Sequence, residues 1–217
     1  MTLSRICFGT AGLTEYYSKN FKPRNPQVLL EYAYKKGIHL FDTAPTYGES
    51  ERMVADLKQK YPDVKISTKC KNRDDIVASL DLFGYIDIMF IHNYSLDNAE
   101  HDLLLERLHI LQQTSKIGKI GVSIYDPKDI PYGYVNIIQA PYSIIDQRFN
   151  DSMQNIGFMA RSVFYRGRIP KNLKYCALPF VIFNKNINYI NIGFNTIGEI
   201  DYAINMSKRV PTINPEY

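Results

Sequence analysis

The sequence predicts an α/β fold, a compact (β/α)8 TIM barrel. Short runs rich in β-branched and aromatic residues alternate with longer helix-patterned segments almost from end to end, as expected of parallel βα units. The strand-like runs number eight, which suits a closed barrel better than an open doubly wound sheet. An open sheet would also need a nucleotide loop after its first strand, and residues 8–12 lack the GxGxxG pattern.

The first half of the chain carries the clearer elements. Strands are expected at residues 5–8, 38–42, 64–68 and 86–91. A helix over residues 26–36 starts with a proline, which suits a first helical turn, and stops at Gly37. Ser50 is expected to cap a second helix that ends near Tyr61, and a third helix is expected at residues 74–82.

The helical pattern weakens in the second half. A fourth helix over residues 99–113 has leucines at core-facing spacing, and strands are expected at 120–123, 136–140, 158–161 and 189–192. Between these strands, residues 127–132 suit a turn or two, and residues 150–155 leave almost no room for a helix. With a last helix at 197–207, we expect a barrel whose crossovers are shortened in its second half.

Length and composition restrict the class of protein. A chain of 217 residues, 45% of them hydrophobic, suits one core better than two, so residues 1–217 are expected to form one domain. The net charge of +4 is spread along the chain, which argues weakly for anionic ligands and against a nucleic-acid partner. No run approaches the roughly 18 to 20 apolar residues of a membrane span, so no membrane partner is expected.

The cysteines indicate neither a disulfide framework nor a metal site. There are 3 of them, widely spaced and without a CxxC pattern. Cys7 and Cys70 lie in or beside expected strands and are interpreted as small buried residues rather than nucleophiles. Because the first residues also lack the apolar core of a signal peptide, a cytoplasmic location is expected.

Ionisable side chains follow three of the expected strands at the same end. Asp42 opens the motif Asp-Thr-Ala-Pro-Thr-Tyr-Gly over residues 42–48, in which a glycine turn lets Tyr47 fold back over its strand. Lys69 closes the run 64–68, and His92 closes the run 86–91. Because the carboxyl ends of barrel strands meet at one mouth, we predict a catalytic site there.

The four residue types suit proton delivery to a carbonyl group. A phenol has a pKa of about 10 and is a poor acid near neutrality unless its anion is stabilised. The ammonium of Lys69 would stabilise it, and Asp42 would hold that ammonium in place and charged. A neutral imidazole at His92 could donate a hydrogen bond to a substrate carbonyl oxygen and orient it.

Strand parity is compatible with this site. Alternate residues of a strand face the same side, so Ser67 and Lys65 share the side of Lys69. His39 has the opposite parity and is interpreted as structural. The residues expected to line the interior below Asp42 and His92 are Ile38, Leu40, Ile86, Ile88 and Phe90.

The motif at residues 42–48, followed by Ser50-Glu51, by Lys69 and by Ile91-His92-Asn93, resembles that of the aldo-keto reductase family. The resemblance extends through residues 119–123 and 138–143 to residues 192–196, so most of the chain is covered in order. It implies a barrel that transfers hydride from a nicotinamide cofactor, usually NADPH, to an aldehyde or ketone. Tyr47 would protonate the developing alkoxide.

The same resemblance implies a cofactor site. Its expected members are Thr10, Ser123, Gln139, Arg161, Ser162, Gly193, Asn195 and Thr196. Ser123 and Gln139 would hold the nicotinamide carboxamide, while Arg161-Ser162 match the position where the family packs a side chain, usually a tyrosine, against the ring. The last three would lie at the phosphate-binding end of the last helix, where backbone N–H groups favour anions. NADPH is expected ahead of NADH, and no metal is expected.

The substrate side of the family site is trimmed in this chain. The family's N-terminal hairpin and long C-terminal loop have no room, so we expect an open, shallow pocket for a small carbonyl compound, sugar-like or otherwise polar. The Lys-Ser and Arg residues that many members use for the 2′-phosphate are also absent after the eighth strand.

Two other functions stay open. The trimmed phosphate site favours a barrel that binds a nicotinamide nucleotide as a sensor or regulatory module, whereas the complete set of four catalytic residue types opposes it. A barrel lyase or epimerase could use Lys69 and His92 as bases without a cofactor, but no phosphate or metal signature supports it.

Overall fold

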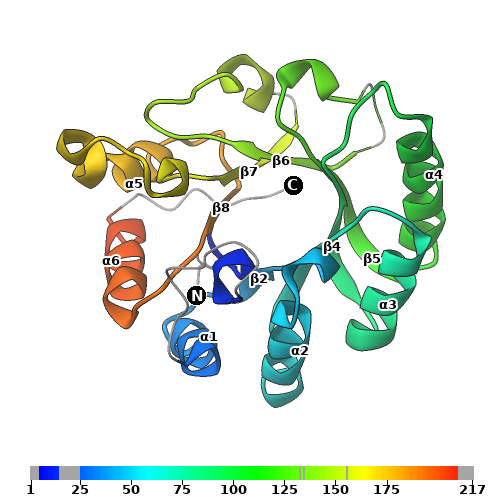
Figure 1. The fold of residues 1–217 in the computed structure, drawn as a ribbon, viewed down its shortest axis with the longest axis horizontal. Helices are drawn as coiled ribbons and strands as arrows, with labels where there is room; N and C mark the ends of the chain where they lie inside the picture. Colours follow the sequence, from blue (N-terminus) through cyan, green and yellow to red (C-terminus); the bar gives the residue numbers. More distant parts are fainter. Residues whose placement is uncertain (1–4, 15–24, 132, 134, 155, 210–217) are drawn as a thin grey trace.

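The computed structural model describes residues 5–14, 25–131, 133, 135–154 and 156–209, within which parallel strands close into an eight-stranded barrel (Figure 1). Each strand pairs with the next in the chain, and β8 pairs with β1 to complete the circle. The (β/α)8 fold is therefore confirmed. The strands are β1 (Ile6–Gly9), β2 (Leu40–Asp42), β3 (Lys65–Cys70), β4 (Ile86–His92), β5 (Ile117–Ser123), β6 (Ile137–Pro141), β7 (Gly157–Arg161) and β8 (Tyr189–Ile192).

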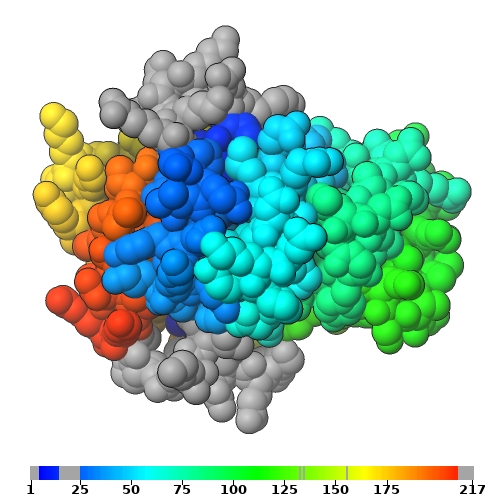
Figure 2. Space-filling view, turned by 90° about the horizontal axis from the view of Figure 1, so that it is seen from below, coloured from blue at the N-terminus to red at the C-terminus, as the bar shows by residue number. Residues whose placement is uncertain are grey.

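A helix follows each of the first four strands, and α1, α2 and α3 lie side by side on one side of the molecule (Figure 2). Asparagine side chains cap three of the four by accepting backbone N–H groups: Asn25, Asn72 and Asn98. The expectation that Ser50 caps the second helix is wrong. Ser50 is the first residue of that helix, and its hydroxyl donates instead to the Thr10 carbonyl oxygen, 3.1 Å away. The four helices are α1 (Pro26–Lys35), α2 (Ser50–Lys60), α3 (Arg73–Phe83) and α4 (Ala99–Gln113).

Two crossovers of the second half are short, as expected, but the one from β7 to β8 is not, because it contains a full helix. The connection from β5 to β6 contains the 3-10 turn η3 (Pro127–Asp129), and that from β6 to β7 contains η4 (Asn150–Gln154). Aromatic side chains cover the strands here. The Phe158 ring of β7 packs against the rings of Tyr142 and Phe149, with centroids 6.1 Å and 5.9 Å away.

One helix is not indicated by the sequence pattern. It is α5 (Lys174–Ile182), which follows the short turns η5 (Tyr165–Gly167) and η6 (Lys171–Leu173) after β7. Pro179 lies inside this helix, and its sequence is apolar on most sides, so neither a helical period nor a start signal marks it. The last helix, α6 (Ile197–Ser207), has the expected bounds.

The barrel interior is a small apolar cluster, separate from the larger one between strands and helices. Its buried members are Cys7, Leu40, Ile88, Phe90, Ile137 and Met159. Ile38 and Ile86, expected inside, belong instead to the larger cluster. Both lie at or before the amino end of a strand, where the helical layer supplies their neighbours. Gly121 is required inside because a Cβ there would lie 2.4 Å from the Phe90 ring.

None of the helices in the described ranges is long and apolar enough to cross a membrane. The same ranges contain no group of three or more His, Cys, Asp or Glu side chains placed to hold a metal ion.

Candidate active site

The motif at residues 42–48 turns the chain back over the end of β2. Pro45 begins the 3-10 turn η2 (Pro45–Tyr47), and Gly48 has a φ of 63°, a left-handed conformation that favours glycine. The Thr14 hydroxyl donates to the Tyr47 carbonyl oxygen at 3.0 Å. As a result the Tyr47 side chain is nearly buried, 7% exposed, beside the strand that carries Asp42.

Asp42 joins four strands through its side chain. Its Oδ1 accepts hydrogen bonds from Ser67 Oγ at 2.8 Å and Gln139 Nε2 at 2.9 Å. Its Oδ2 accepts from Lys69 Nζ and Asn191 Nδ2, each at 2.6 Å. A carboxylate offers about four acceptor positions, so those of Asp42 are filled. This carboxylate therefore holds the mouth together and leaves no position for a ligand.

Lys69 is a buried ammonium placed against a phenol. Besides Asp42, its Nζ donates to the Thr43 carbonyl oxygen at 2.9 Å and lies 5.0 Å from the centre of the Tyr47 ring. Burial opposes the charge, but Asp42 and then Tyr47 outweigh it, so the pKa of Lys69 lies above its usual value. Since the lysine stays charged, it can stabilise a negative charge on the Tyr47 oxygen.

His92 faces Tyr47 from the end of β4. The two rings meet edge to face, with centroids 6.0 Å apart and planes at 88°. Burial first, then the charges of Lys69 and Lys71, lower the pKa of His92 to about 4. The imidazole is therefore neutral near pH 7, the form that can donate one hydrogen bond to a carbonyl oxygen.

Two expected cofactor residues lie beside this cluster. Ser123, the last residue of β5, is paired in register with Gln139 in the middle of β6, and the Ser123 hydroxyl donates to Gln139 Oε1 at 3.4 Å. The amide of Gln139 also contacts Met159 Sδ at 3.0 Å. Gln139 thus connects Ser123 to Asp42 across the barrel mouth.

Thr10 and Arg161 also flank the mouth. Thr10 is fully buried, and both its amide and its hydroxyl donate to the Asp42 carbonyl oxygen, at 2.9 Å and 3.0 Å. Arg161 ends β7 with its guanidinium 4.3 Å from the centre of the Tyr125 ring, and Ser162 follows with a φ of 57°.

The remaining expected cofactor residues lie apart from the cluster, at the start of α6. Thr196 caps this helix in a capping box, in which its hydroxyl accepts from the Glu199 amide. The Glu199 carboxylate accepts from the backbone amides of Asn195 and Thr196, at 2.7 Å and 3.3 Å. Gly193 is exposed just before them. A carboxylate of the chain itself therefore already binds the two backbone N–H groups that precede this helix.

The structure adds residues that the sequence analysis does not single out. Asn191 binds Asp42 from β8, while Tyr125 stacks on Arg161. Asn191 could have been found by parity, because this polar residue lies two places after Tyr189 and two before Gly193, and so faces inward on an apolar strand. Nothing in the sequence around Tyr125 marks it.

Comparisons of sequence identify the family to which this chain is similar. A model described as the Aldo/keto reductase family matches residues 5–172. The NADH-specific methylglyoxal reductase of Escherichia coli is 31% identical over 159 residues, covering 56% of this chain and 49% of that protein. The probable aldo-keto reductase 1 of Glycine max is 34% identical over 71 residues, covering 32% of this chain and 20% of that protein. The match thus spans about half the length of the Escherichia coli relative and 20% of the Glycine max relative.

Solved structures share the fold. A putative aldo-keto reductase of Pseudomonas aeruginosa superposes with a TM-score of 0.76 at 17% identity, covering 95% of this chain and 90% of that one. An aldo/keto reductase of Klebsiella pneumoniae, in complex with NADP and acetate, gives 0.76 at 16% identity, covering 97% and 88%. At such identities these likenesses establish the barrel and nothing finer.

Proposed function

The chain belongs to the aldo/keto reductase family, and from this premise we propose that it reduces an aldehyde or ketone with a nicotinamide dinucleotide, using Tyr47 as the proton donor. The observation that carries the proposal is the buried ammonium of Lys69, held by Asp42 at 2.6 Å and lying 5.0 Å from the centre of the Tyr47 ring. A phenol in that position can release its proton to an alkoxide at neutral pH, because the phenolate left behind is stabilised.

Four residues have separate roles at the carbonyl group. The reduced nicotinamide, when bound, supplies the hydride for the carbonyl carbon. As the carbonyl oxygen gains negative charge, the neutral imidazole of His92 donates a hydrogen bond to it, and the Tyr47 hydroxyl delivers its proton to the same oxygen. Lys69 stabilises the phenolate, while Asp42 keeps Lys69 charged and in position. The reverse sequence oxidises an alcohol.

The residues around the mouth fit a nicotinamide. The Ser123 hydroxyl and the Gln139 amide lie side by side on β5 and β6, where they can hold the carboxamide. In barrels of this type, phosphate groups commonly bind between the loops after β7 and β8 and a helix N-terminus. Arg161 ends β7 and Ser162 follows it, while Gly193, Asn195 and Thr196 lie between β8 and α6.

The residues at the start of α6 bear on the choice between NADH and NADPH. The Glu199 carboxylate, bound to the backbone amides of Asn195 and Thr196, would repel a 2′-phosphate but could accept a ribose hydroxyl. The resemblance favours NADPH, and the Klebsiella structure contains NADP, whereas the Escherichia coli relative is named as NADH-specific. We propose that NADH binds at least as well as NADPH. A small polar carbonyl substrate and a cytoplasmic location stay predictions.

The proposal is tested first by binding and then by turnover. NADH and NADPH are titrated against the purified protein by nicotinamide fluorescence, and a panel of aldehydes and ketones is then offered to the complex. We expect cofactor binding followed by carbonyl-dependent loss of nicotinamide absorbance. If neither cofactor binds, the oxidoreductase function is excluded.

A further inference from the structure

Asn191 shares one oxygen of Asp42 with the ammonium of Lys69. Its Nδ2 donates from β8 to Asp42 Oδ2 at 2.6 Å, and Lys69 Nζ donates to the same atom at the same distance. Ser67 and Gln139 donate to the other oxygen, Oδ1. Among the described residues, Asn191 is thus the side chain that competes with Lys69 for a single carboxylate oxygen.

The orientation of the Asn191 carboxamide is fixed by its surroundings. With Oδ1 and Nδ2 exchanged, two acceptor oxygens would face each other at 2.6 Å, so the amide nitrogen must point to Asp42. The Oδ1 atom is buried and accepts no hydrogen bond from the part of the chain that the structure describes. Because such an unpaired acceptor costs free energy, the contact of Nδ2 with Asp42 determines where this side chain lies.

Gly9 leaves the space that this orientation needs. It ends β1 and pairs in register with Asp42. A Cβ at Gly9 would overlap Asn191 Oδ1 and lie 3.3 Å from Asn191 Cγ. Gly9 has no left-handed φ. The position therefore requires glycine for close approach of the Asn191 side chain and not for its backbone conformation.

A second donor on the shared oxygen changes how Lys69 acts on Tyr47. The amide hydrogen of Asn191 neutralises part of the charge on Asp42 Oδ2, so the carboxylate attracts the ammonium less strongly. More of the positive charge of Lys69 then acts on Tyr47, whose ring centre lies 5.0 Å from Nζ. The contact of Asn191 with Asp42 consequently favours the phenolate form of Tyr47.

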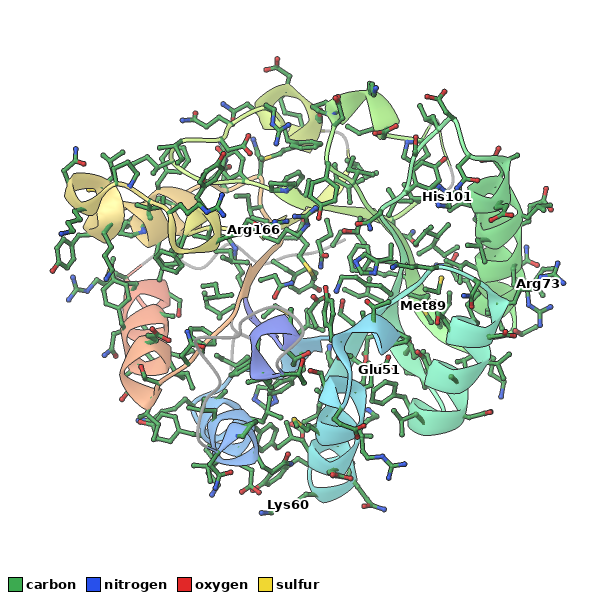
Figure 3. All side chains as sticks on the ribbon, viewed as in Figure 1. Glu51, Lys60, Arg73, Met89, His101 and Arg166 are labelled. Atoms are coloured by element: carbon green, nitrogen blue, oxygen red, sulfur yellow. The ribbon has the colours of Figure 1, made fainter. Side chains whose placement is uncertain are left out.

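Side chains from the strands occupy the interior of the ring that β1 to β8 form (Figure 3). The groups that can ionise and that act on Tyr47 or Asp42 come from five strands: Cys7 of β1, Asp42 of β2, Lys69 of β3, His92 of β4 and Arg161 of β7. Replacing Asn191 by an apolar residue leaves all five in place. A change in the ionisation of Tyr47 is then due to the lost amide.

We propose that Asn191 is a positioning residue, which strengthens Tyr47 as a proton donor through Asp42 and Lys69, and that Gly9 provides the space for it. Asn191 acts on these two side chains and not on the substrate. Its role in turnover rests on the reductase function proposed above, whereas its effect on the ionisation of Tyr47 does not.

A titration of Tyr47 tests the proposal without turnover. The protein is labelled with tyrosine carrying ¹³C at Cζ, and the Tyr47 signal is identified by its loss in Tyr47→Phe. We expect the acid dissociation constant of Tyr47 to fall at least about threefold in Asn191→Leu. Gly9→Ala, which displaces the same carboxamide, should give a fall in the same direction and decides the question if Asn191→Leu does not fold.

Asn188→Leu is the matched control. Asn188 lies just before β8 and accepts a hydrogen bond from the Phe158 amide at 2.7 Å, away from Asp42. Its replacement should lower stability and leave the titration of Tyr47 unchanged. An unchanged titration in Asn191→Leu and Gly9→Ala, or an equal change in Asn188→Leu, overturns the proposal.

The pH dependence of carbonyl reduction tests the role in turnover. Reduction needs the protonated phenol, so kcat declines as the pH rises through the pKa of Tyr47. In Asn191→Leu this decline should move to higher pH, kcat below it should fall at least about threefold, and KM should change by less than about twofold. A fall in kcat with the decline unmoved would mean a structural role only and contradicts the proposal. A changed Tyr47 titration in a protein that reduces no carbonyl supports the effect of Asn191 and contradicts only the reductase function.

Discussion

Replacing Lys69 by methionine should leave a buried carboxylate without its counter-ion. Lys69 and Asp42 are each 2% exposed, and the ammonium makes hydrogen bonds of 2.6 Å to Asp42 and 2.9 Å to Thr43. Removing one partner of a buried pair costs about 3 to 5 kcal/mol. Because Ser67, Gln139 and Asn191 still donate to Asp42 in the variant, we expect the low end, about 3 kcal/mol of the free energy of unfolding.

A double-mutant cycle measures the coupling of this pair. Asp42→Asn alone should also cost about 3 kcal/mol, because the buried ammonium loses its charged partner. In the double variant neither charge is buried without its partner. Its loss in the free energy of unfolding should therefore be at least about 1 kcal/mol smaller than the sum of the two single losses. Urea unfolding can be followed by circular dichroism and by tyrosine fluorescence, since the chain has 17 tyrosines and no tryptophan. Additivity within about 0.5 kcal/mol, or a single-variant cost below about 1 kcal/mol, would refute the reasoning.

Three further predictions concern packing, protonation and cofactor choice. Gly121→Ala places a Cβ 2.4 Å from the Phe90 ring and should cost about 1 to 3 kcal/mol in urea unfolding. A Cβ added at Gly12 meets no atom within 4 Å, so Gly12→Ala should hardly change the free energy of unfolding. Equal costs for the two substitutions would contradict the packing described at Gly121. His92 has its pKa lowered from 6.5 to about 4. Between these values the unfolded chain binds the proton and the folded chain does not, so stability should fall by up to about 3 kcal/mol as the pH drops through this window. The urea midpoint should vary less across that pH range in His92→Gln than in the wild-type protein. Equal variation in the two proteins would contradict the lowered pKa of His92. Glu199→Gln keeps the capping box but removes the charge. The ratio of the NADH and NADPH dissociation constants should therefore shift about fivefold toward NADPH, and an unchanged ratio would exclude Glu199 as the determinant.

Much of the fold follows from local sequence patterns. The alternation of β-rich runs and amphipathic segments predicts all eight strands, and turn and cap signals predict α1 to α4 and α6 to within a few residues. The pattern fails at α5, where Pro179 and an almost wholly apolar sequence conceal the helix. It also fails at Ser50, since a hydroxyl that suits a helix cap has a tertiary partner in Thr10. Such outcomes depend on contacts between distant segments.

Strand ends and strand parity predict only part of the candidate site. They place Asp42, Tyr47, Lys69 and His92 at one mouth, where the structure has them in contact. Local patterns cannot indicate that Asp42 is shared by four strands, because Asn191 lies 149 residues away along the chain. The stacking of Arg161 on Tyr125 likewise depends on how two separate loops meet.

The measurement that tests the proposed mechanism most directly is carbonyl reduction by Tyr47→Phe, with the NADH dissociation constant measured on the same preparation. The substitution removes the phenolic proton but keeps the ring against Lys69 and His92. We predict that kcat falls by about 100-fold or more while the affinity for NADH changes by less than about threefold. Unchanged carbonyl reduction would contradict the assignment of Tyr47 as the acid. Cofactor binding without turnover in the wild-type protein would favour the sensor function instead.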